Sequence, residues 1–350
     1  MEGFASRTGL TSSAPERRYL WTDAFAVCNF IGLGPTDLAL RLIDRVHRVL
    51  GRHRDDDPRS GWISGLSEAE GEAHPTRGGL RIGKPLPERG PREPFDERAE
   101  WDRDGQYFHY LTRWMHALDR AARATGRPRL NFWARELMQA AFAAFTTGKR
   151  MVWKKSIDLS RTLVPSMGQH DPVDGFVTCA QLRAGTDPSA AGPDLAGALA
   201  GFGRMIEGGD WATADPLGLG GLLADALRAA RLVEGGSLPD DSLVQALLGA
   251  ARDGLHLYAQ LDELAQPASR RLAFRELGLS IGLHAAQRLE GRDLSAATRA
   301  LLAELRPFFP QAEAIESFWV RRRGDASRAE HQDIDDVMLA TSLAPGGFLE

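Results

Sequence analysis

Cysteine is scarce in the 350-residue sequence, which contains only Cys28 and Cys179. Each lies in an apolar stretch of helical character, where a free thiol commonly behaves as a small hydrophobic residue. Two such residues do not make the disulfide framework of a secreted scaffold. Long hydrophobic runs are also absent: no stretch of about 20 apolar residues occurs, and the first residues lack the apolar segment of a signal peptide. We therefore predict a cytoplasmic protein that does not cross a membrane.

Neither sign of charge dominates the sequence. The 43 basic and 47 acidic residues give a formal net charge of −4 at pH 7, which creates no field that would attract a phosphate backbone. The densest basic cluster, at residues 321–323, is typical of a solvated helix end. Nucleic acid is therefore not expected as a partner.

Several motifs of common enzymes are missing as well. The sequence has no phosphate-binding glycine loop, no Cys or His spacing for a structural metal and no serine elbow. The glycines at 218, 220 and 221 follow no predicted strand, so we assign them to helix packing or to loops. Neither a metal nor a cofactor is predicted.

Helical periodicity is what the sequence does have, most clearly at residues 101–126. Apolar residues recur there at steps of three and four: Tyr107, Leu111, Trp114, Leu118 and Ala121. Gly126 and Pro128 supply stop signals, and a second apolar stripe then runs from Trp133 to Phe145. The two stripes predict a helical hairpin.

The same unit recurs, so that six hairpins are predicted in one all-α domain spanning residues 1–350. The other five pairs are 17–33 with 36–50, 172–184 with 194–207, 216–233 with 241–262, 270–290 with 295–306, and 311–323 with 333–343. Unit lengths vary, which favours a closed (α/α)6 toroid over a regular open array. Long rim loops are predicted at about 51–100 and 146–171, with short strands at Leu80–Ile82 and Met151–Trp153.

Polar and aromatic residues concentrate beside these loops. In RYLWTDAF, Asp23 either caps a helix or contacts a substrate, while Trp21 offers a flat surface suited to a sugar ring. The segment WDRDGQYFHY, residues 101–110, contains two aspartates, and a helix cap needs only one of them. The other carboxylate, together with Gln106 and His109, forms a candidate polar rim.

A third cluster precedes the helix predicted from residue 172. Loops attract polar residues for turn chemistry alone, yet His170 beside Asp171 is the strongest candidate for general acid/base groups. His331 stands outside the last helix and becomes a site candidate if ring closure brings it beside residues 18–25.

Four segments carry a resemblance: RYLWTDAF, GWISGL, WDRDGQYFHYLTRWMHALDRAA and QHDPVDG. With the hairpins, they resemble uncharacterised bacterial proteins of the six-hairpin glycosidase superfamily over nearly the whole chain. That superfamily implies an (α/α)6 toroid with a funnel at one end, lined by aromatic and acidic residues, where most studied members bind carbohydrate. Its unsaturated glucuronyl and rhamnogalacturonyl hydrolases have an early tryptophan and aspartate similar to Trp21 and Asp23. Its N-acylglucosamine epimerase-like members use paired histidines, for which His170 and His331 are candidates.

The first functional hypothesis is therefore a glycoside hydrolase acting on a small saccharide or a uronic-acid-containing sugar. The acid/base candidates are Asp23, Asp102, Asp104, His170 and Asp171. The candidates for substrate contact are Trp21, Trp62, Lys84, Trp101, Gln106, His109, Trp153, Gln169 and His331. A sugar epimerase or isomerase, and a noncatalytic sugar-binding protein, remain open alternatives. The expected partner is a small carbohydrate, and no oligomeric state is predicted.

Overall fold

The computed structural model describes residues 1–166, 168–186, 192–324 and 330–350. These residues are mostly helical, with a few strands of two or three residues and no barrel among them, so the all-α prediction is confirmed. The chain divides into two compact units. The N-terminal unit is Glu2–Glu207, and the C-terminal unit is Gly208–Glu350 together with Met1.

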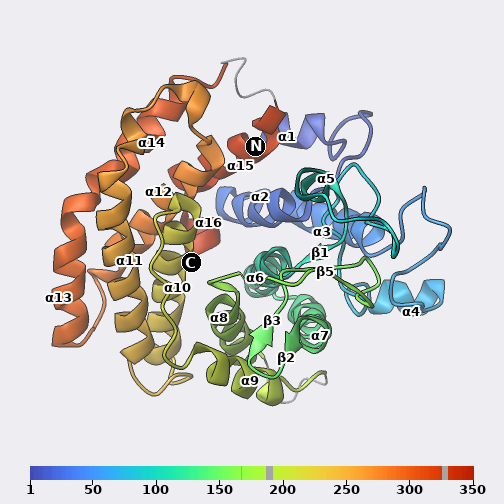
Figure 1. Cartoon of the computed structure of the whole chain (residues 1–350), viewed down its shortest axis with the longest axis horizontal. Coiled ribbons are helices and arrows are strands. Elements are labelled where there is room, and N and C mark those ends of the chain that lie inside the picture. The colour runs from blue at the N-terminus through green and yellow to red at the C-terminus, as the bar shows by residue number, and fades with distance from the viewer. Residues whose placement is uncertain (167, 187–191, 325–329) are drawn as a thin grey trace. The chain divides into compact units, whose positions relative to one another are not determined.

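Three helical hairpins form the body of the N-terminal unit. They are α2 (Leu20–Leu33) with α3 (Thr36–Leu50), α6 (Phe108–Thr125) with α7 (Pro128–Phe145), and α8 (Asp171–Ala184) with α9 (Ala196–Ile206). The first helices of the hairpins pack side by side, α2 against α6 and α6 against α8 (Figure 1). Their amino ends therefore lie close together.

The two long connections of this unit contain short elements that periodicity does not reveal. The helices are α4 (Glu68–Ala73) and α5 (Glu97–Asp102), and the strands are β1 (Gln106–Tyr107), β2 (Thr146–Thr147), β3 (Arg150–Met151), β4 (Lys154–Lys155) and β5 (Thr162–Val164). Another short helix, α1 (Glu2–Arg7), precedes the first hairpin. Antiparallel pairing gives a sheet of order β1-β4-β5 and a separate β2-β3 pair. The strand predicted at Leu80–Ile82 is wrong: the backbone N–H of Leu80 donates to the side chain of Gln106 instead of a neighbouring strand. Of the strand predicted at Met151–Trp153, only Met151 lies in a strand, β3, and β4 begins after this range at Lys154.

The C-terminal unit also contains three hairpins. They are α10 (Pro216–Glu234) with α11 (Ser242–Gln260), α12 (Ala273–Leu289) with α13 (Ala296–Leu305), and α14 (Pro310–Val320) with α15 (Gln332–Leu343). Single turns lie at η1 (Glu263–Ala265), η2 (Ala268–Arg270) and η3 (Arg306–Phe308), and α16 (Gly346–Leu349) ends the chain. Helix α12 is the centre of this unit, because it packs against α10, α14 and α15.

Glycines allow α10 and α12 to approach each other at backbone contact. A methyl group on Gly220 would overlap the carbonyl of Gly278, and one on Gly282 would lie 2.5 Å from the Cα of Gly220. The assignment of Gly220 to helix packing is therefore confirmed, and the close approach explains why this residue lacks a side chain.

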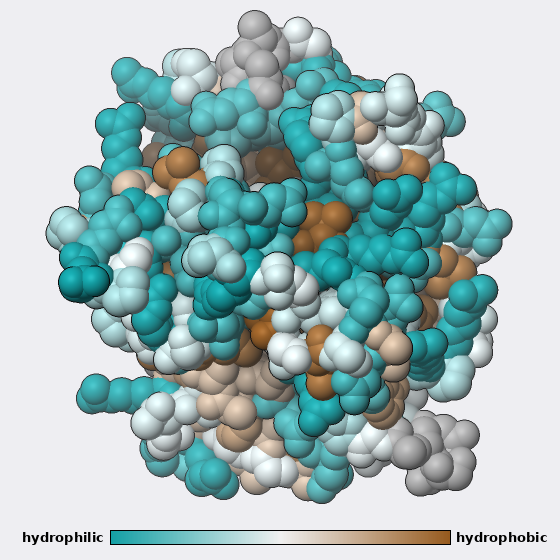
Figure 2. Space-filling view, turned by 90° about the vertical axis from the view of Figure 1, so that its right-hand side faces the viewer, coloured by the Kyte–Doolittle hydropathy of each residue, from teal (hydrophilic) through white to brown (hydrophobic). Residues whose placement is uncertain are grey.

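Large aromatic residues fill the core of the N-terminal unit, where Phe30, Phe108, Trp114 and Phe145 are almost fully buried. The face of the molecule in Figure 2 is largely hydrophilic, and the most hydrophobic residues show there in small separate spots. None of the helices that the structure describes combines the length and the apolar character needed to cross a membrane.

Candidate functional site

Aromatic rings from several segments of the N-terminal unit meet at the amino ends of α2 and α6. The ring centroid of Trp21 lies 5.3 Å from that of Tyr110 and 5.9 Å from that of His109. His109 stacks on Trp153 at 6.0 Å with the planes 9° apart, and Trp153 meets Trp101 edge to face at 5.5 Å. We call the following residues the aromatic cluster: Tyr19, Trp21, Trp101, Tyr107, His109, Tyr110 and Trp153.

The pairing of β1 with β4 brings Trp153 to the cluster. Tyr107 pairs with Lys154 in this ladder, and its ring then lies 5.0 Å from that of Trp153. The approach depends on Gly105, which has a φ of 148° and where a Cβ would lie 2.7 Å from the carbonyl oxygen of Lys155. Lys154 stabilises the junction, because its buried ammonium group donates to the carbonyls of Glu100 and Arg103 at 2.8 Å each.

Asp171 is the most unusual titratable group near the cluster. Burial raises the pKa of its carboxyl group to about 7, and the neighbouring charge of Asp174 adds to the effect, whereas the backbone of Gly168 and the charge of Arg113 oppose it. Its Oδ2 atom is buried and accepts no hydrogen bond from the residues that the structure describes. A Cβ on Gly168 would lie 2.5 Å from this oxygen, so a side chain at this position would force the Asp171 carboxyl group to move. A carboxyl group in this setting keeps its proton near neutral pH.

Asp174 lies one helical turn after Asp171 and contacts Arg113 and Thr112. Arg113 Nη2 lies 3.4 Å from Asp174 Oδ1, and the Thr112 hydroxyl donates to Oδ2. The Arg113 guanidinium group also lies 6.0 Å from the ring centroid of Trp21. Asp174 and Arg113 therefore connect Asp171 to the aromatic cluster.

Two polar atoms inside the aromatic cluster are enclosed by protein. His109 Nδ1 and Trp21 Nε1 are buried and have no hydrogen-bond partner among the described residues. Burial lowers the pKa of His109 to about 4, Arg113 acts in the same direction, and Asp174 opposes the shift. His109 is therefore neutral at pH 7, and its Nδ1 atom is enclosed without a hydrogen-bond partner among the described residues.

Four of the predicted site residues make contacts that hold the local fold. Asp23 Oδ2 accepts from the backbone N–H of Tyr19 at 3.0 Å and so caps the start of α2. Asp104 accepts from the backbone of Gly83 at 2.9 Å and pairs with Arg81 at 3.0 Å. The other two are also buried: Gln106 donates to the carbonyl of Ile157 at 2.6 Å, and the Trp62 ring packs against Gly71 beneath the Arg52 guanidinium group.

The remaining predicted residues lie on the surface or at its edge. Asp102 and Gln169 are exposed, and Lys84 Nζ lies 5.4 Å from the ring centroid of Tyr19. His170 immediately precedes α8, where its carbonyl accepts the backbone N–H of Asp174. His331 belongs to the C-terminal unit, where its ring contacts that of Phe274 at 5.7 Å, and its place beside residues 18–25 stays a prediction.

Tyr19, Tyr110, Arg113 and Asp174 belong to the site but are not among the residues selected from the sequence. Helical spacing carries a signal for two of them. Arg113 follows His109 by four residues in α6, and Asp174 follows Asp171 by three residues in α8, so each pair shares one helix face. The contact between the two helices brings the faces together.

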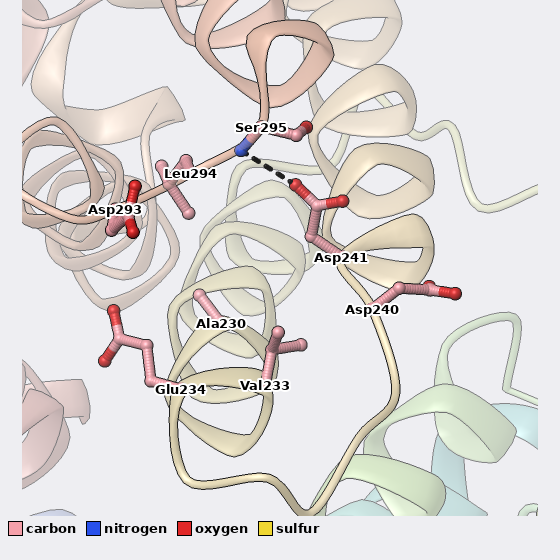
Figure 3. Close-up of a pocket in the computed structure, with 8 residues that line it drawn as sticks. All are labelled: Ala230, Val233, Glu234, Asp240, Asp241, Asp293, Leu294 and Ser295. Carbon is pink, nitrogen blue, oxygen red and sulfur yellow. Dashed lines mark hydrogen bonds between the residues drawn. The ribbon is translucent and has the colours of Figure 1, made fainter.

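The C-terminal unit contains a cavity of about 450 Å³ at the carboxyl end of α10 (Figure 3). Its lining residues are Ala230, Val233, Glu234, Asp240, Asp241, Asp293, Leu294 and Ser295. The Asp241 carboxylate turns toward Ser295 and accepts from its backbone N–H at 3.3 Å and from the Thr298 hydroxyl at 2.5 Å. Glu234 pairs with Arg292. Because these two carboxylates are held by neighbouring residues, we assign them to joining the helix ends.

Comparisons with known proteins give no family for this chain: no family model, curated protein or solved structure matches it. Among the described residues, no three His, Cys, Asp or Glu side chains are grouped so that they could hold a metal ion. Function must therefore be inferred from the site in the N-terminal unit.

Proposed function

We propose that this chain is a carbohydrate-active enzyme, foremost a glycoside hydrolase, with Asp171 as its proton donor. The observation that carries the proposal is a buried carboxyl group with a pKa raised to about 7 that is linked to an aromatic cluster through the ion pair of Asp174 with Arg113. Glycoside hydrolysis needs a carboxylic acid that is still protonated at working pH, and environments of this kind produce one.

The aromatic cluster supports a sugar as the ligand. Flat rings present apolar surface to the C–H groups of a sugar, while hydroxyl groups need hydrogen-bond partners nearby. Trp21 Nε1 and His109 Nδ1 are polar atoms of the cluster without a hydrogen-bond partner among the described residues, and both are enclosed by protein, so a ligand would reach them only after a local rearrangement. The cluster thus combines apolar surface with a few polar atoms that can fix the orientation of a ligand.

In the proposed reaction, the Asp171 proton passes to the glycosidic oxygen as the bond from that oxygen to the anomeric carbon breaks. Water provides the hydroxyl group that the anomeric carbon gains, and the second proton of that water restores a carboxyl group. Asp174, which is paired with Arg113, opposes the positive charge that develops on the sugar ring. A separation of about 5 Å between the two carboxyl groups in the complex would lead to retention, and one of about 6.5–9.5 Å to inversion.

We also propose that the chain forms one domain with the (α/α)6 toroid that the sequence resemblance implies. The protein would be cytoplasmic, with a carbohydrate as its partner. Each unit supplies three of the six hairpins that such a ring needs. The site described above lies within the N-terminal unit alone, so the proposed chemistry does not depend on how the ring closes.

The test is a screen of the purified full chain against mono- and oligosaccharides, including uronic acids. Thermal shift would report binding, and chromatography would report products. We expect hydrolysis by the wild type, and Asp171→Asn should reduce the rate by about 10²–10⁴-fold while ligand stabilisation remains. The wild-type kcat/KM should fall as the pH rises above about 7, because a proton donor must keep its proton.

Asp55→Asn is the matched control, because it makes the same exchange at an exposed aspartate. Wild-type turnover by Asp171→Asn would overturn the assignment of the proton donor. Ligand stabilisation without product in every variant would replace the hydrolase by a sugar-binding protein, and interconversion of sugars without hydrolysis would replace it by an epimerase.

A further inference from the structure

Lys84 is a cationic side chain that the first long connection brings to the edge of the aromatic cluster. Gly83, which has a φ of 92°, packs so closely that a Cβ there would lie 2.2 Å from the carbonyl oxygen of Arg18. The next residue, Lys84, therefore lies beside the start of α2, and its Nζ atom is 5.4 Å from the ring centroid of Tyr19.

Charged side chains fix the backbone of Lys84 on both sides. Its N–H group donates to Asp104 Oδ1 at 3.3 Å, and its carbonyl oxygen accepts from Arg54 Nη1 at 2.7 Å. Asp104 is completely buried and also pairs with Arg81 at 3.0 Å. The Lys84 backbone is thus held in place, while the residue itself stays partly exposed.

The cationic side chains that lie over rings of the aromatic cluster differ in whether a carboxylate neutralises them. Arg113 pairs with Asp174 at 3.4 Å, and Lys154 pairs with Glu100 at 2.9 Å. The ammonium group of Lys84 has no ion-pair or hydrogen-bond partner among the described residues. One positive charge is therefore left uncompensated at this edge of the cluster.

A pair of phenol groups lies at the same edge. Tyr19 Oη is 2.6 Å from Tyr110 Oη, and the two rings meet edge to face. Both tyrosines are partly exposed, unlike the enclosed Nε1 atom of Trp21. Ammonium and phenol groups donate hydrogen bonds to carboxylate and phosphate oxygens. The edge thus combines an uncompensated positive charge with polar groups that a ligand can reach from solvent.

From these contacts we infer that the ligand carries an anionic group, a carboxylate or a phosphate, which binds to Lys84 beside the Tyr19 hydroxyl group. An anionic ligand forms a charge-assisted hydrogen bond with Lys84, whereas a neutral one leaves its charge uncompensated. Carboxylate and phosphate share this chemistry, and the experiment distinguishes them. The anion site does not depend on hydrolysis, but the identification of the ligand as an acidic sugar rests on the proposed function.

The experiment measures binding to the purified full chain by titration calorimetry at constant ionic strength. The probes are glucuronate, glucose 6-phosphate, acetate and inorganic phosphate, with glucose as the neutral comparison. We expect the wild type to bind an acidic sugar more tightly than glucose, and the tighter of the two acidic sugars identifies the anionic group. Lys84→Met should weaken that sugar by roughly tenfold or more, since a charge-assisted hydrogen bond is lost, and should leave glucose unchanged.

Two further variants make the result specific. Lys84→Arg keeps the positive charge and should restore most of the affinity. Lys149→Met removes a lysine of the same unit whose side chain is 69 % exposed, and it should bind every probe as the wild type does.

The anion site would be overturned if the wild type bound none of the anions, or if Lys84→Met bound them with unchanged affinity. An equal loss in Lys149→Met would also overturn it, because general charge attraction would then explain the binding. A loss of glucose affinity as large as that of the acidic sugar would assign Lys84 a structural role instead. Failure of the proposed function looks different: anions would bind through Lys84, but no saccharide would be hydrolysed.

Discussion

Arg113 Nη2 lies 3.4 Å from Asp174 Oδ1. The Arg113 guanidinium group also lies over the Trp21 ring, and the charge of Asp174 helps to raise the pKa of Asp171, so this ion pair links the ring to the buried carboxyl group. The side chains of Arg113 and Asp174 are 9 % and 4 % exposed, so both charges are largely removed from water. A buried pair of this kind is strongly coupled, because neither charge is tolerated alone.

Arg113→Met should destabilise the protein by about 3–5 kcal/mol, since the Asp174 charge is left buried without its partner. Combining it with Asp174→Asn should recover part of the loss, and urea unfolding would measure both variants. Arg252→Met is a control at the surface: Arg252 pairs with Asp253 at 2.8 Å and with Glu304 at 3.1 Å, and the side chains of both acidic partners are more than half exposed. This control exchange should lower the free energy of unfolding by about 1 kcal/mol or less. Equal losses at the two arginines would contradict the prediction.

Asp171→Asn should stabilise the protein at alkaline pH, at the cost of activity. The pKa of Asp171 is raised from 3.8 to about 7, so its contribution to stability is complete below pH 3.8 and is lost as the pH rises to about 7. Asparagine cannot ionise, so the free energy of unfolding of the variant should exceed that of the wild type by on the order of a few kcal/mol at about pH 8 and by little at about pH 4. Denaturant midpoints at the two pH values test this, with Asp55→Asn as control. A gain of equal size at both would argue against ionisation as the cause.

The sequence predicts the helical hairpins well, because each has an apolar stripe ended by glycine or proline. It misplaces the start of α6, which begins at Phe108 and not at residue 101. Gly105 breaks the pattern there, and β1 forms through pairing with β4, a partner some 50 residues away. Helices of four to six residues, such as α4 and α16, are too short to show a period.

The site is also predictable only in part, because several of its residues have partners that lie far away in the chain. Trp21, His109 and Asp171 stand out as polar or aromatic residues at helix starts, and the packing of α2, α6 and α8 brings their segments together. The structural roles of Asp104 and Gln106 depend on backbone groups more than 20 residues away in the chain. Such partners leave no local pattern, so a buried structural carboxylate and a reactive one look alike in the sequence.

His284 should make stability depend on pH in the C-terminal unit. Its Nε2 lies 2.8 Å from Glu316 Oε1, which also accepts the Ser342 hydroxyl at 2.7 Å and so joins α12, α14 and α15. The hydrogen bond to Glu316 raises the pKa of His284 above 6.5, and the pKa of Glu316 falls below 4.5 despite the opposing effect of burial. The histidine contribution is present below pH 6.5 and lost as the pH rises through the folded pKa. The glutamate contribution is present above pH 4.5 and lost as the pH falls through its folded pKa.

His284→Gln should therefore lower the free energy of unfolding by about 1–2 kcal/mol between about pH 5 and 6. The difference in unfolding free energy from the wild type should be smaller at about pH 9. Urea unfolding across this range would measure it. His256→Gln is the control, because His256 contacts the Phe308 ring and has no described carboxylate partner. A loss at His284 that does not change with pH would show that packing, and not the charge, is responsible.

Gly220→Ala should destabilise the C-terminal unit, because the new methyl group would overlap the carbonyl of Gly278 and force α10 away from α12. Since that obstacle is backbone, rotamer changes cannot relieve the overlap, and we expect a cost of about 1–3 kcal/mol or more. Gly249→Ala in α11 makes the same exchange where a Cβ would have no neighbour within 4 Å. It should stabilise the protein by about 0.5–1 kcal/mol, since alanine restricts the unfolded chain and favours the helix. Urea unfolding should thus give opposite signs for the two variants; a Gly220→Ala protein as stable as the wild type would mean that α10 and α12 do not meet at backbone contact.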